Sequence, residues 1–183
     1  MFDFLLALAA TVILAVPVML VAILVRLTSP GPALYWSDRV GHRNKIFKMP
    51  KFRSMRLGTP AVATHLLLNA KSHLTPIGSF LRKSSIDELP QLWSILLGDM
   101  SFVGPRPALF NQHALIELRT QLGVHELVPG LTGWAQINGR DELPISEKVA
   151  LDAEYLYSKS LWFDICILWL TFVKVIRRDG ITH

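Results

Sequence analysis

The longest hydrophobic run of the chain lies near its start. Phe4 to Val25 contains 22 residues that are apolar except for Thr11. As a straight α-helix this run would be about 33 Å long, which is enough to cross a bilayer. Pro17 lies inside the run and predicts a bend, because proline cannot donate the backbone hydrogen bond of its turn. The pattern favours a kinked helix that spans the membrane, with a re-entrant hairpin as the alternative.

The segment after this run is strongly basic. Ten Lys and Arg occur between Arg39 and Ile86, and no Asp or Glu occurs there. By the positive-inside rule, such a segment lies on the cytoplasmic side of a membrane. Its cations, among them Lys51 and Arg53, can bind anionic lipid headgroups or the phosphates of a substrate; a solvated basic face is the structural alternative. The chain carries no recognised nucleic-acid-binding signature, so we expect no nucleic acid partner.

Two adjacent carboxylates, Asp87 and Glu88, stand just ahead of a short helix that we predict at about residues 90–97. Pro90 suits the first helical position, where a missing N–H has no consequence. A capping box formed by Ser85 and Glu88 is the alternative. That box would place Pro90 inside the helix at a cost of about 3 kcal/mol. We therefore expect the two carboxylates to be available for chemistry.

A rigid turn follows this helix. The sequence Gly104-Pro105-Arg106-Pro107 fixes its backbone through two prolines and presents a single cation, Arg106. Beyond the turn, the pattern of residues 108–122 predicts a helix.

Residues 129–140 predict a turn and a short strand. Trp134, Gln136 and Asn138 alternate with apolar residues, and the Asn-Gly pair that ends the alternation is a strong turn signal. Trp134 could stack on a base, and Gln136, Asn138 or Arg140 could contact a ligand. A structural hairpin with a buried Trp134 is an equal alternative.

Two further helices are predicted, at about residues 146–157 and 161–176. In the second helix the polar residues fall on one narrow stripe, which consists of Asp164, Thr171 and Lys174. A narrow polar stripe with two Trp and a basic end is typical of a helix that lies in the membrane interface. A core helix of the domain is the alternative.

Composition narrows the chemistry. The 183 residues suit one domain, and 51% of them are hydrophobic with a mean hydropathy of +0.36, which is more apolar than a typical soluble enzyme. The single Cys166 cannot form an intrachain disulfide, and the six His show no zinc-ligand spacing. Phosphate-loop, dinucleotide-binding and nucleophile-elbow motifs do not occur. Two carboxylates, many cations and a membrane segment fit phosphate chemistry on a lipid, in which a carboxylate attacks phosphorus or holds Mg²⁺.

Several motifs of the chain resemble those of the bacterial sugar transferase family, the monotopic phosphoglycosyl transferases. The resemblance covers nearly the whole chain, and with only the apolar run ahead of its motifs the chain is similar to the minimal catalytic form of that family. The motifs are Arg39-Val40-Gly41, Lys51-Phe52-Arg53-Ser54-Met55, Asp87-Glu88-Leu89-Pro90-Gln91-Leu92, Gly104-Pro105-Arg106-Pro107 and residues 129–140. The chain departs from the family at three positions, where Val16 replaces a Ser, Ser37 a Gln and Pro50 a Tyr.

The resemblance implies a reaction that starts polyprenol-linked glycan assembly. Asp87 would attack the β-phosphate of a UDP-sugar and release UMP. A polyprenol phosphate, expected to be undecaprenyl phosphate, would then take the phosphosugar from Asp87, which makes the mechanism ping-pong. Mg²⁺ would be required and would touch Asp87, while Glu88 would assist as a metal or proton partner. The substrate phosphates would be bound by Arg82, Arg106, Arg140, Lys51 and Arg53.

The same resemblance implies a mainly α fold with a small β hairpin. Residues 1–29 would form a re-entrant membrane helix broken near Pro17, which reverses the preference drawn from the residue pattern alone. Residues 30–183 would form a compact catalytic domain with interfacial amphipathic helices, on the cytoplasmic face of the bacterial inner membrane. The expected partners are a UDP-sugar, a polyprenol phosphate, the lipid bilayer and a second copy of the chain in a homodimer.

Two rival interpretations stay open at this point. A membrane-anchored scaffold that binds anionic lipids through its basic face would explain the anchor and the charge, although not the adjacent carboxylates. Direct displacement, with Asp87 as a metal ligand only, would explain the carboxylates without a covalent intermediate.

Overall fold

The computed structural model describes residues 2–60, 62, 69–139 and 143–177. The predicted phosphate contact Arg140 lies outside the described residues. The chain forms two compact units, Met1–Asp38 with Lys48–Leu97 and Arg39–Phe47 with Gly98–His183. The helices and strands are α1 (Phe2–Thr28), β1 (Leu34–Val40), η1 (His42–Asn44), β2 (Ile46–Phe52), η3 (Ala70–His73), α2 (Gly78–Lys83), η4 (Ile86–Gln91), α3 (Leu92–Leu96), β3 (Ser101–Val103), β4 (Ala108–Leu109), α4 (His113–Gln121), η5 (Val124–Glu126), β5 (Gly130–Thr132), α5 (Trp134–Ile137), α6 (Ile145–Ser158) and α7 (Leu161–Arg177), where η marks a 3-10 helix.

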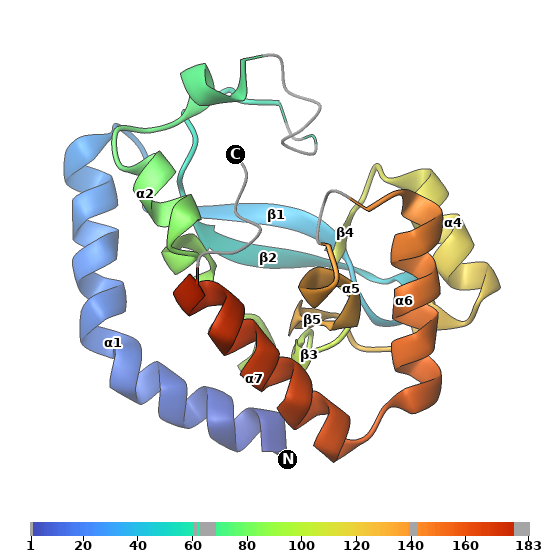
Figure 1. Ribbon diagram of the computed structural model, residues 1–183. Coiled ribbons are helices and arrows are strands. Elements are labelled where there is room, and N and C mark those ends of the chain that lie inside the picture. The colour runs from blue at the N-terminus through green and yellow to red at the C-terminus, as the bar shows by residue number, and fades with distance from the viewer. Residues whose placement is uncertain (1, 61, 63–68, 140–142, 178–183) are drawn as a thin grey trace. The chain divides into compact units, whose positions relative to one another are not determined.

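The predicted apolar helix is present as α1, one helix of 27 residues with Pro17 inside it. Figure 1 shows that α1 changes direction near its middle, as a proline inside a helix favours. Within the described ranges, α1 is the one helix long and apolar enough to cross a membrane. Only 6% of its most apolar 18-residue window is buried, so the protein leaves most of this apolar surface uncovered. The re-entrant path of the helix stays a prediction.

The C-terminal half of α1 belongs to the core of the first unit. Val25 is fully buried and packs with Phe52 of β2 and Leu81 of α2. Val21 and Val18, one and two turns earlier, line the same cluster, and α1 also packs against α3. The apolar helix α1 is therefore joined to its unit by packed side chains, because its apolar run continues into the hydrophobic core.

Two small sheets complete the fold. Strands β2, β1 and β4 form the first sheet in that order, and β4 pairs antiparallel with β1 so that Arg39 lies opposite Leu109. The second sheet is the parallel pair β3 and β5, in which Ser101 lies opposite Gly130. The predicted mainly helical class is confirmed. The small β element of the fold consists of the neighbouring strands β1 and β2, which are joined by residues 41–45.

The strand predicted within residues 129–140 is wrong beyond Thr132. Trp134–Ile137 forms the short helix α5 instead. The Ile137 amide donates to the carbonyl of Gly133 at 3.1 Å, and the Asn138 side chain donates to the carbonyl of Trp134 at 2.8 Å. A segment this short contains too few residues for its hydrophobic period to separate a helical turn from a strand.

The helix predicted at residues 90–97 begins earlier than expected. Asp87, Glu88 and Pro90 all lie inside the 3-10 helix η4, and α3 follows at Leu92. The tighter 3-10 winding replaces the α-helical turn that Pro90 would disrupt. Ser85 precedes η4 with φ 56° and makes no side-chain cap bond, so the capping box is absent.

The helix predicted over residues 108–122 also starts later than expected. Ala108 and Leu109 pair with β1 as strand β4, and α4 begins only at His113. The helices predicted at residues 146–157 and 161–176 are confirmed as α6 and α7.

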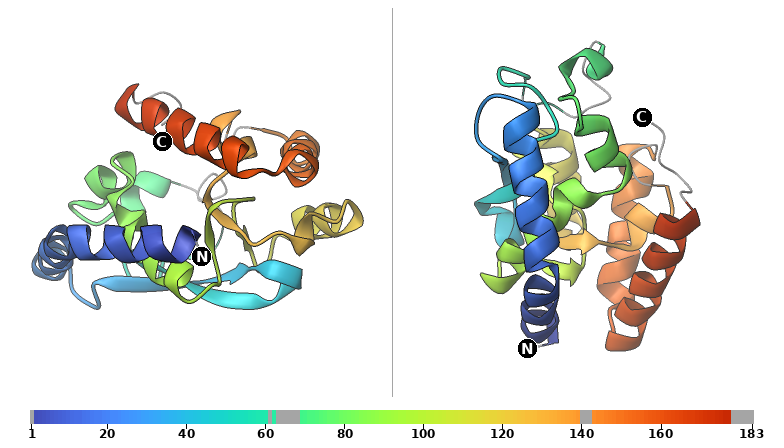
Figure 2. Two further views of the ribbon diagram at one scale, coloured as in Figure 1. Left: turned by 90° about the horizontal axis from the view of Figure 1, so that it is seen from below. Right: turned by 90° about the vertical axis from the view of Figure 1, so that its left-hand side faces the viewer.

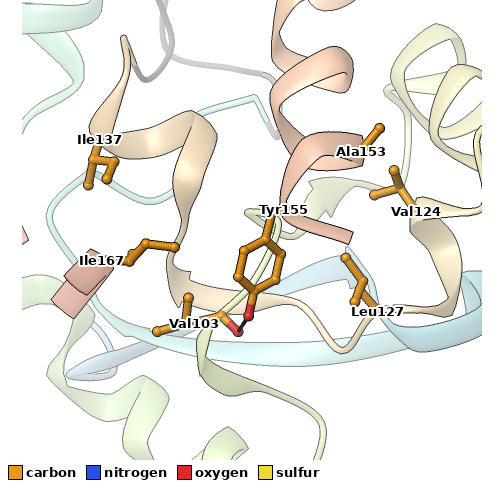
Figure 3. Close-up of a cluster of buried hydrophobic side chains, with 7 residues drawn as sticks. All are labelled: Val103, Val124, Leu127, Ile137, Ala153, Tyr155 and Ile167. Carbon is orange, nitrogen blue, oxygen red and sulfur yellow. Dashed lines mark hydrogen bonds between the residues drawn. The ribbon is translucent and has the colours of Figure 1, made fainter. Parts of the chain in front are cut away.

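The core of the second unit is built around Tyr155 (Figure 3). Its ring is 1% exposed, and its hydroxyl lies 2.7 Å from Asp164 Oδ1 and 3.3 Å from the carbonyl oxygen of Val103. The hydroxyl thus links α6, α7 and β3. The apolar side chains around the ring are Val103, Val124, Leu127, Ile137, Ala153 and Ile167.

Helix α7 turns its polar stripe toward the protein. Asp164 contacts Tyr155, Thr171 Oγ1 lies 2.7 Å from Thr132 Oγ1, and Lys174 donates to the carbonyl of Ile137. Within the second unit, α7 packs against β3, β5 and α5 (Figure 2). The face left exposed is apolar and consists of Leu161, Trp162, Ile165, Trp169, Leu170, Phe172 and Val175.

Candidate functional site

The adjacent carboxylates lie on η4, between α2 and α3 of the first unit. The left-handed residue Ser85 starts this turn, and the amide of Glu88 donates to its carbonyl at 3.1 Å. Asp87 is only 8% exposed, so its carboxylate is held in a largely dehydrated position. Gln91, one turn later, is fully buried, and its side-chain Nε2 has no hydrogen-bond partner.

Lys51 and Glu88 are brought together in this unit. Lys51 Nζ lies 2.7 Å from Glu88 Oε1, and the two side chains are 14% and 20% exposed. Sequence reasoning placed both residues in the site but did not pair them, because they are far apart in sequence. The pair gives the second carboxylate a counter-ion from β2.

The Arg53 side chain lies just beyond the C-terminal end of the apolar helix α1. Its guanidinium donates to the carbonyls of Ser29, Pro30 and Gly31, and to the Ser29 hydroxyl at 2.8 Å. Burial, with a smaller contribution from the nearby charge of Arg26, lowers the pKa of Arg53. These carbonyls follow the last residue of α1, Thr28, and a cation beside the C-terminal end of a helix is favourably placed in the helix dipole. This geometry indicates a structural role for Arg53, whereas the sequence predicted a phosphate contact.

Arg82 stands in the last turn of α2, which packs against η4. Its carbonyl accepts a hydrogen bond from the amide of Ser85 at 3.2 Å. The half-buried Arg82 side chain is therefore carried by the segment that leads directly into the carboxylate pair.

Arg106 belongs to the second unit, in the loop between β3 and β4. The backbone of this loop lies directly against the segment that leads into β5. Gly104 donates to the carbonyl of Thr132, and Gly130 donates to the carbonyl of Pro105, both at 2.9 Å. A Cβ atom at Gly104 would lie 2.4 Å from the carbonyl oxygen of Val128, so only glycine allows this approach. The two glycine-containing motifs are therefore one packed structure.

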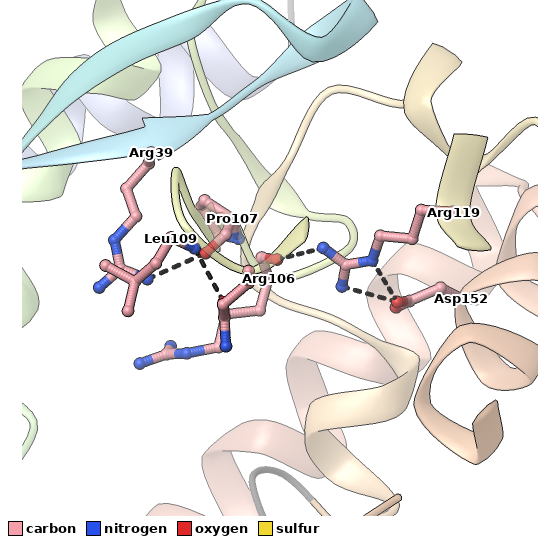
Figure 4. A network of polar contacts seen from close by, with 7 residues as sticks. Arg39, Arg106, Pro107, Leu109, Arg119 and Asp152 are labelled. Atoms are coloured by element: carbon pink, nitrogen blue, oxygen red, sulfur yellow. Dashed lines mark hydrogen bonds and ion pairs between the residues drawn. The ribbon is translucent and has the colours of Figure 1, made fainter. Parts of the chain in front are cut away.

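Two arginines that the sequence did not mark as functional also hold this loop (Figure 4). Arg119 donates to the carbonyl of Arg106 at 2.8 Å, and Arg39 donates to the carbonyl of Pro107 at 3.0 Å. Arg119 is paired with Asp152 of α6. Arg39 lies in the motif Arg39-Val40-Gly41, which carries the family resemblance. Arg119 and Asp152 are 33 positions apart in the sequence, and no local pattern predicts that they pair.

The predicted nucleotide contacts are engaged within the protein. Trp134 Nε1 donates to Glu154 at 2.9 Å, and the Trp134 ring packs on Phe163 with ring centroids 5.1 Å apart. Gln136 Nε2 donates to the carbonyl of Leu131 at 3.0 Å, while its buried Oε1 has no partner. Asn138 caps the same turn. Their contacts with a nucleotide stay a prediction.

The donor chemistry of the carboxylate pair suits Mg²⁺, whose binding here stays a prediction. This ion is usually held in proteins by one or two carboxylates together with substrate phosphates. Asp87 and Glu88 supply such a set on one helical turn. The described ranges contain no group of three His, Cys, Asp or Glu that could hold a metal, so the remaining ligands would come from substrate and water.

Comparison with known proteins gives consistent matches. The model of a family described as bacterial sugar transferase matches residues 1–178. The chain is 41% identical over 171 residues to a UDP-glucose:undecaprenyl-phosphate glucose-1-phosphate transferase of Xanthomonas campestris, covering 88% of the chain and 35% of the relative. It is 42% identical over 162 residues to the Escherichia coli protein of the same name, covering 84% and 35%.

A third relative differs in its sugar. An undecaprenyl-phosphate galactose phosphotransferase of Salmonella typhimurium is 39% identical over 166 residues, covering 82% of the chain and 34% of the relative. The chain spans about a third of the length of these three relatives.

Proposed function

Because the chain belongs to the bacterial sugar transferase family, we propose that it transfers a sugar 1-phosphate from a UDP-sugar to a polyprenol phosphate. The products are a polyprenol-diphosphate-sugar and UMP. The names of three relatives, which are glucose or galactose phosphate transferases of undecaprenyl phosphate, support this reaction class. The observation that carries the proposal is the buried Asp87 beside Glu88, on a turn in the unit whose core includes the end of the apolar helix α1.

The chemistry proposed for Asp87 is nucleophilic. One carboxylate oxygen of Asp87 forms a bond to the β-phosphorus of the UDP-sugar, and the bond from that phosphorus to the bridging oxygen breaks, so UMP leaves with the electron pair. A phosphate oxygen of the polyprenol phosphate then attacks the same phosphorus and releases the Asp87 carboxylate. A carboxylate nucleophile divides one difficult phosphoryl transfer into two steps of this kind.

The neighbouring groups support this chemistry. Lys51 keeps the Glu88 carboxylate fixed beside the nucleophile, and Glu88 assists as a metal or proton partner. Mg²⁺ bound to Asp87 would neutralise charge on the diphosphate. Arg82 and Arg106 contact substrate phosphates in this proposal, and Arg140 is a third candidate outside the described residues.

The membrane has two proposed contacts. Helix α1 enters the bilayer from the cytoplasmic face of the bacterial inner membrane and, bent at Pro17, returns to it as a re-entrant helix. The exposed apolar face of α7, with Trp162 and Trp169, lies in the membrane interface, where Trp side chains are favoured. A polyprenol phosphate in that membrane is the expected acceptor.

The experiment is UMP release by the purified chain in lipid nanodiscs with UDP-glucose, UDP-galactose and other UDP-sugars. Mg²⁺ is present, and each donor is tested with and without undecaprenyl phosphate. We expect turnover with the acceptor for at least one donor, its loss on chelation, and its loss in Asp87→Asn. The matched control is Asp38→Asn, an exposed carboxylate that pairs with Lys48 on the surface. Absence of UMP release from every donor would favour the scaffold interpretation.

A further inference from the structure

We propose that Arg119 is a positioning residue for Arg106, acting through the backbone of the loop that presents it. The inference rests on the proposed function, because it assigns Arg106 to a substrate phosphate. It adds a residue that neither the motifs nor the family resemblance marked.

The orientation of the Arg119 side chain is fixed by its ion pair with Asp152. Its side chain is 8% exposed and lies on α4. Nε and Nη2 donate to the same oxygen, Asp152 Oδ2, at 2.9 and 2.7 Å. Asp152 lies on α6 and is 2% exposed. Because the guanidinium is planar and carries its donors in a fixed arrangement, this pairing sets the direction of the remaining donors.

The remaining nitrogen of the Arg119 guanidinium, Nη1, points to the backbone of Arg106. Arg119 Nη1 donates to the carbonyl oxygen of Arg106 at 2.8 Å. In Figure 4 the side chain of Arg106 extends away from Arg119. The charge of Arg119 is neutralised by Asp152, so Arg119 can fix the carbonyl of Arg106 without serving as a second phosphate contact.

The carbonyls on both sides of Arg106, those of Pro105 and Pro107, also accept hydrogen bonds. Pro105 accepts from the amide of Gly130, and Pro107 accepts from Arg39 at 3.0 Å. The two prolines fix their own φ angles. Three consecutive carbonyls, those of residues 105–107, are therefore bonded to three different elements, which leaves Arg106 little freedom other than its side-chain torsions.

The functional consequence follows from the sensitivity of phosphoryl transfer to placement. A misplacement of about 1 Å can lower the rate about 100-fold. Loss of the Arg119 contact would free the Arg106 carbonyl and allow the loop backbone to shift. The effect of Arg119 on the reaction should therefore require the guanidinium of Arg106.

A double-mutant cycle in kcat/KM for the UDP-sugar tests this requirement. Arg119→Lys keeps a positive charge for Asp152 but cannot supply the same three donors. We expect Arg119→Lys to lose about 10-fold and Arg106→Gln about 100-fold in kcat/KM, with the double variant no worse than Arg106→Gln alone. Arg43→Lys is the matched control, because Arg43 of the same unit makes an exposed ion pair with Glu126.

Additive losses in the double variant would overturn the inference, since they would show that Arg119 acts by general destabilisation. If Arg119→Lys does not fold, as judged by thermal unfolding, Asp152→Asn takes its place in the cycle with the same expected non-additivity, because it weakens the pairing that orients Arg119. A normal kcat/KM for Arg106→Gln would also overturn the inference. Failure of the wild type to turn over any UDP-sugar is a distinct result, because it would contradict the proposed function itself.

Discussion

Lys51 Nζ lies 2.7 Å from Glu88 Oε1, and both side chains are largely buried. The second carboxylate of the adjacent pair is thus held against a cation from β2. This contact supports the proposed division of roles, in which Glu88 assists and Asp87 is the nucleophile.

Replacing Lys51 with Met would leave the Glu88 carboxylate mostly buried without its counter-ion. We expect the free energy of unfolding to fall by about 1–3 kcal/mol, because an ion in a dehydrated position is costly when its partner is removed. Thermal unfolding in detergent measures this change. The control is Lys48→Met on the same strand as Lys51, which removes an exposed pair with Asp38 of β1 and should cost less than about 1 kcal/mol. Equal decreases in the free energy of unfolding of Lys51→Met and Lys48→Met would contradict the prediction that the buried pair of Lys51 and Glu88 contributes more than an exposed pair.

The contact between Arg53 and the end of α1 can be disturbed without removing a charge. A Cβ atom at Gly31, where φ is +110°, would lie 2.2 Å from Arg53 Nη1. We expect Gly31→Ala to displace the guanidinium and to destabilise the protein by about 2 kcal/mol or more, while Gly58→Ala costs only the backbone strain of about 1–2 kcal/mol. Gly58 has φ +82° and open space around it.

Substitutions at Arg53 and Gly31 distinguish a structural role of Arg53 from a role in binding a substrate phosphate. A structural Arg53 predicts that Arg53→Gln and Gly31→Ala lower the unfolding temperature together, with the KM for the UDP-sugar unchanged in the folded fraction. A large increase of that KM in Arg53→Gln alone would restore the phosphate role that the sequence predicted.

Asp152 gives the stability a specific pH dependence. Burial raises the pKa of Asp152 above its ordinary value, although the charge and hydrogen bonds of Arg119 oppose the shift. A raised folded-state pKa means that the contribution of Asp152 is fully present below the unfolded value of 3.8 and is lost as pH rises through the folded pKa. The stability of the wild type relative to Asp152→Asn should therefore fall as pH increases above 3.8. Thermal unfolding of both proteins in a series of buffers of increasing pH measures this change. A stability of the wild type that rises with pH relative to Asp152→Asn would contradict the prediction.

The exposed face of α7 should lie among lipids. In nanodiscs with brominated lipids, we expect bromine to quench Trp162 and Trp169, whose side chains are exposed on this face. Trp162→Phe with Trp169→Phe should remove much of the quenched fluorescence. Trp134→Phe is the control, because Trp134 is half-buried and bonded to Glu154. If the quenched fluorescence is unchanged by the double substitution, α7 lies away from the membrane.

The sequence predicted the elements with long, strong patterns. Helices α1, α6 and α7 are each predicted within a few residues of their observed bounds, because α1 is a continuous apolar run and the other two patterns extend over ten or more residues. The short elements were not. Trp134 to Ile137 was expected as a strand and is one helical turn, held by side-chain bonds to the backbone that no period reveals.

The sequence likewise predicts some features of the candidate site and not others. Asp87, Glu88 and Arg106 stand in motifs whose local chemistry is visible in the sequence. The pairing of Lys51 with Glu88 and that of Arg119 with Asp152 depend on the tertiary fold, which joins positions 37 and 33 residues apart. The polar stripe of α7 was visible in the sequence, but the sequence could not show that this stripe faces the protein and leaves the apolar face exposed.

The central claim is that Asp87 carries the phosphosugar as a covalent intermediate. The most direct test is the intact mass of the protein after rapid acid quench, with Mg²⁺ and the preferred UDP-sugar but without polyprenol phosphate. We predict a mass increase of one phosphosugar on the wild type, its disappearance when the acceptor is added, and none on Asp87→Asn. UMP release that occurs only with the acceptor, with no change in protein mass, would contradict the claim and favour direct displacement.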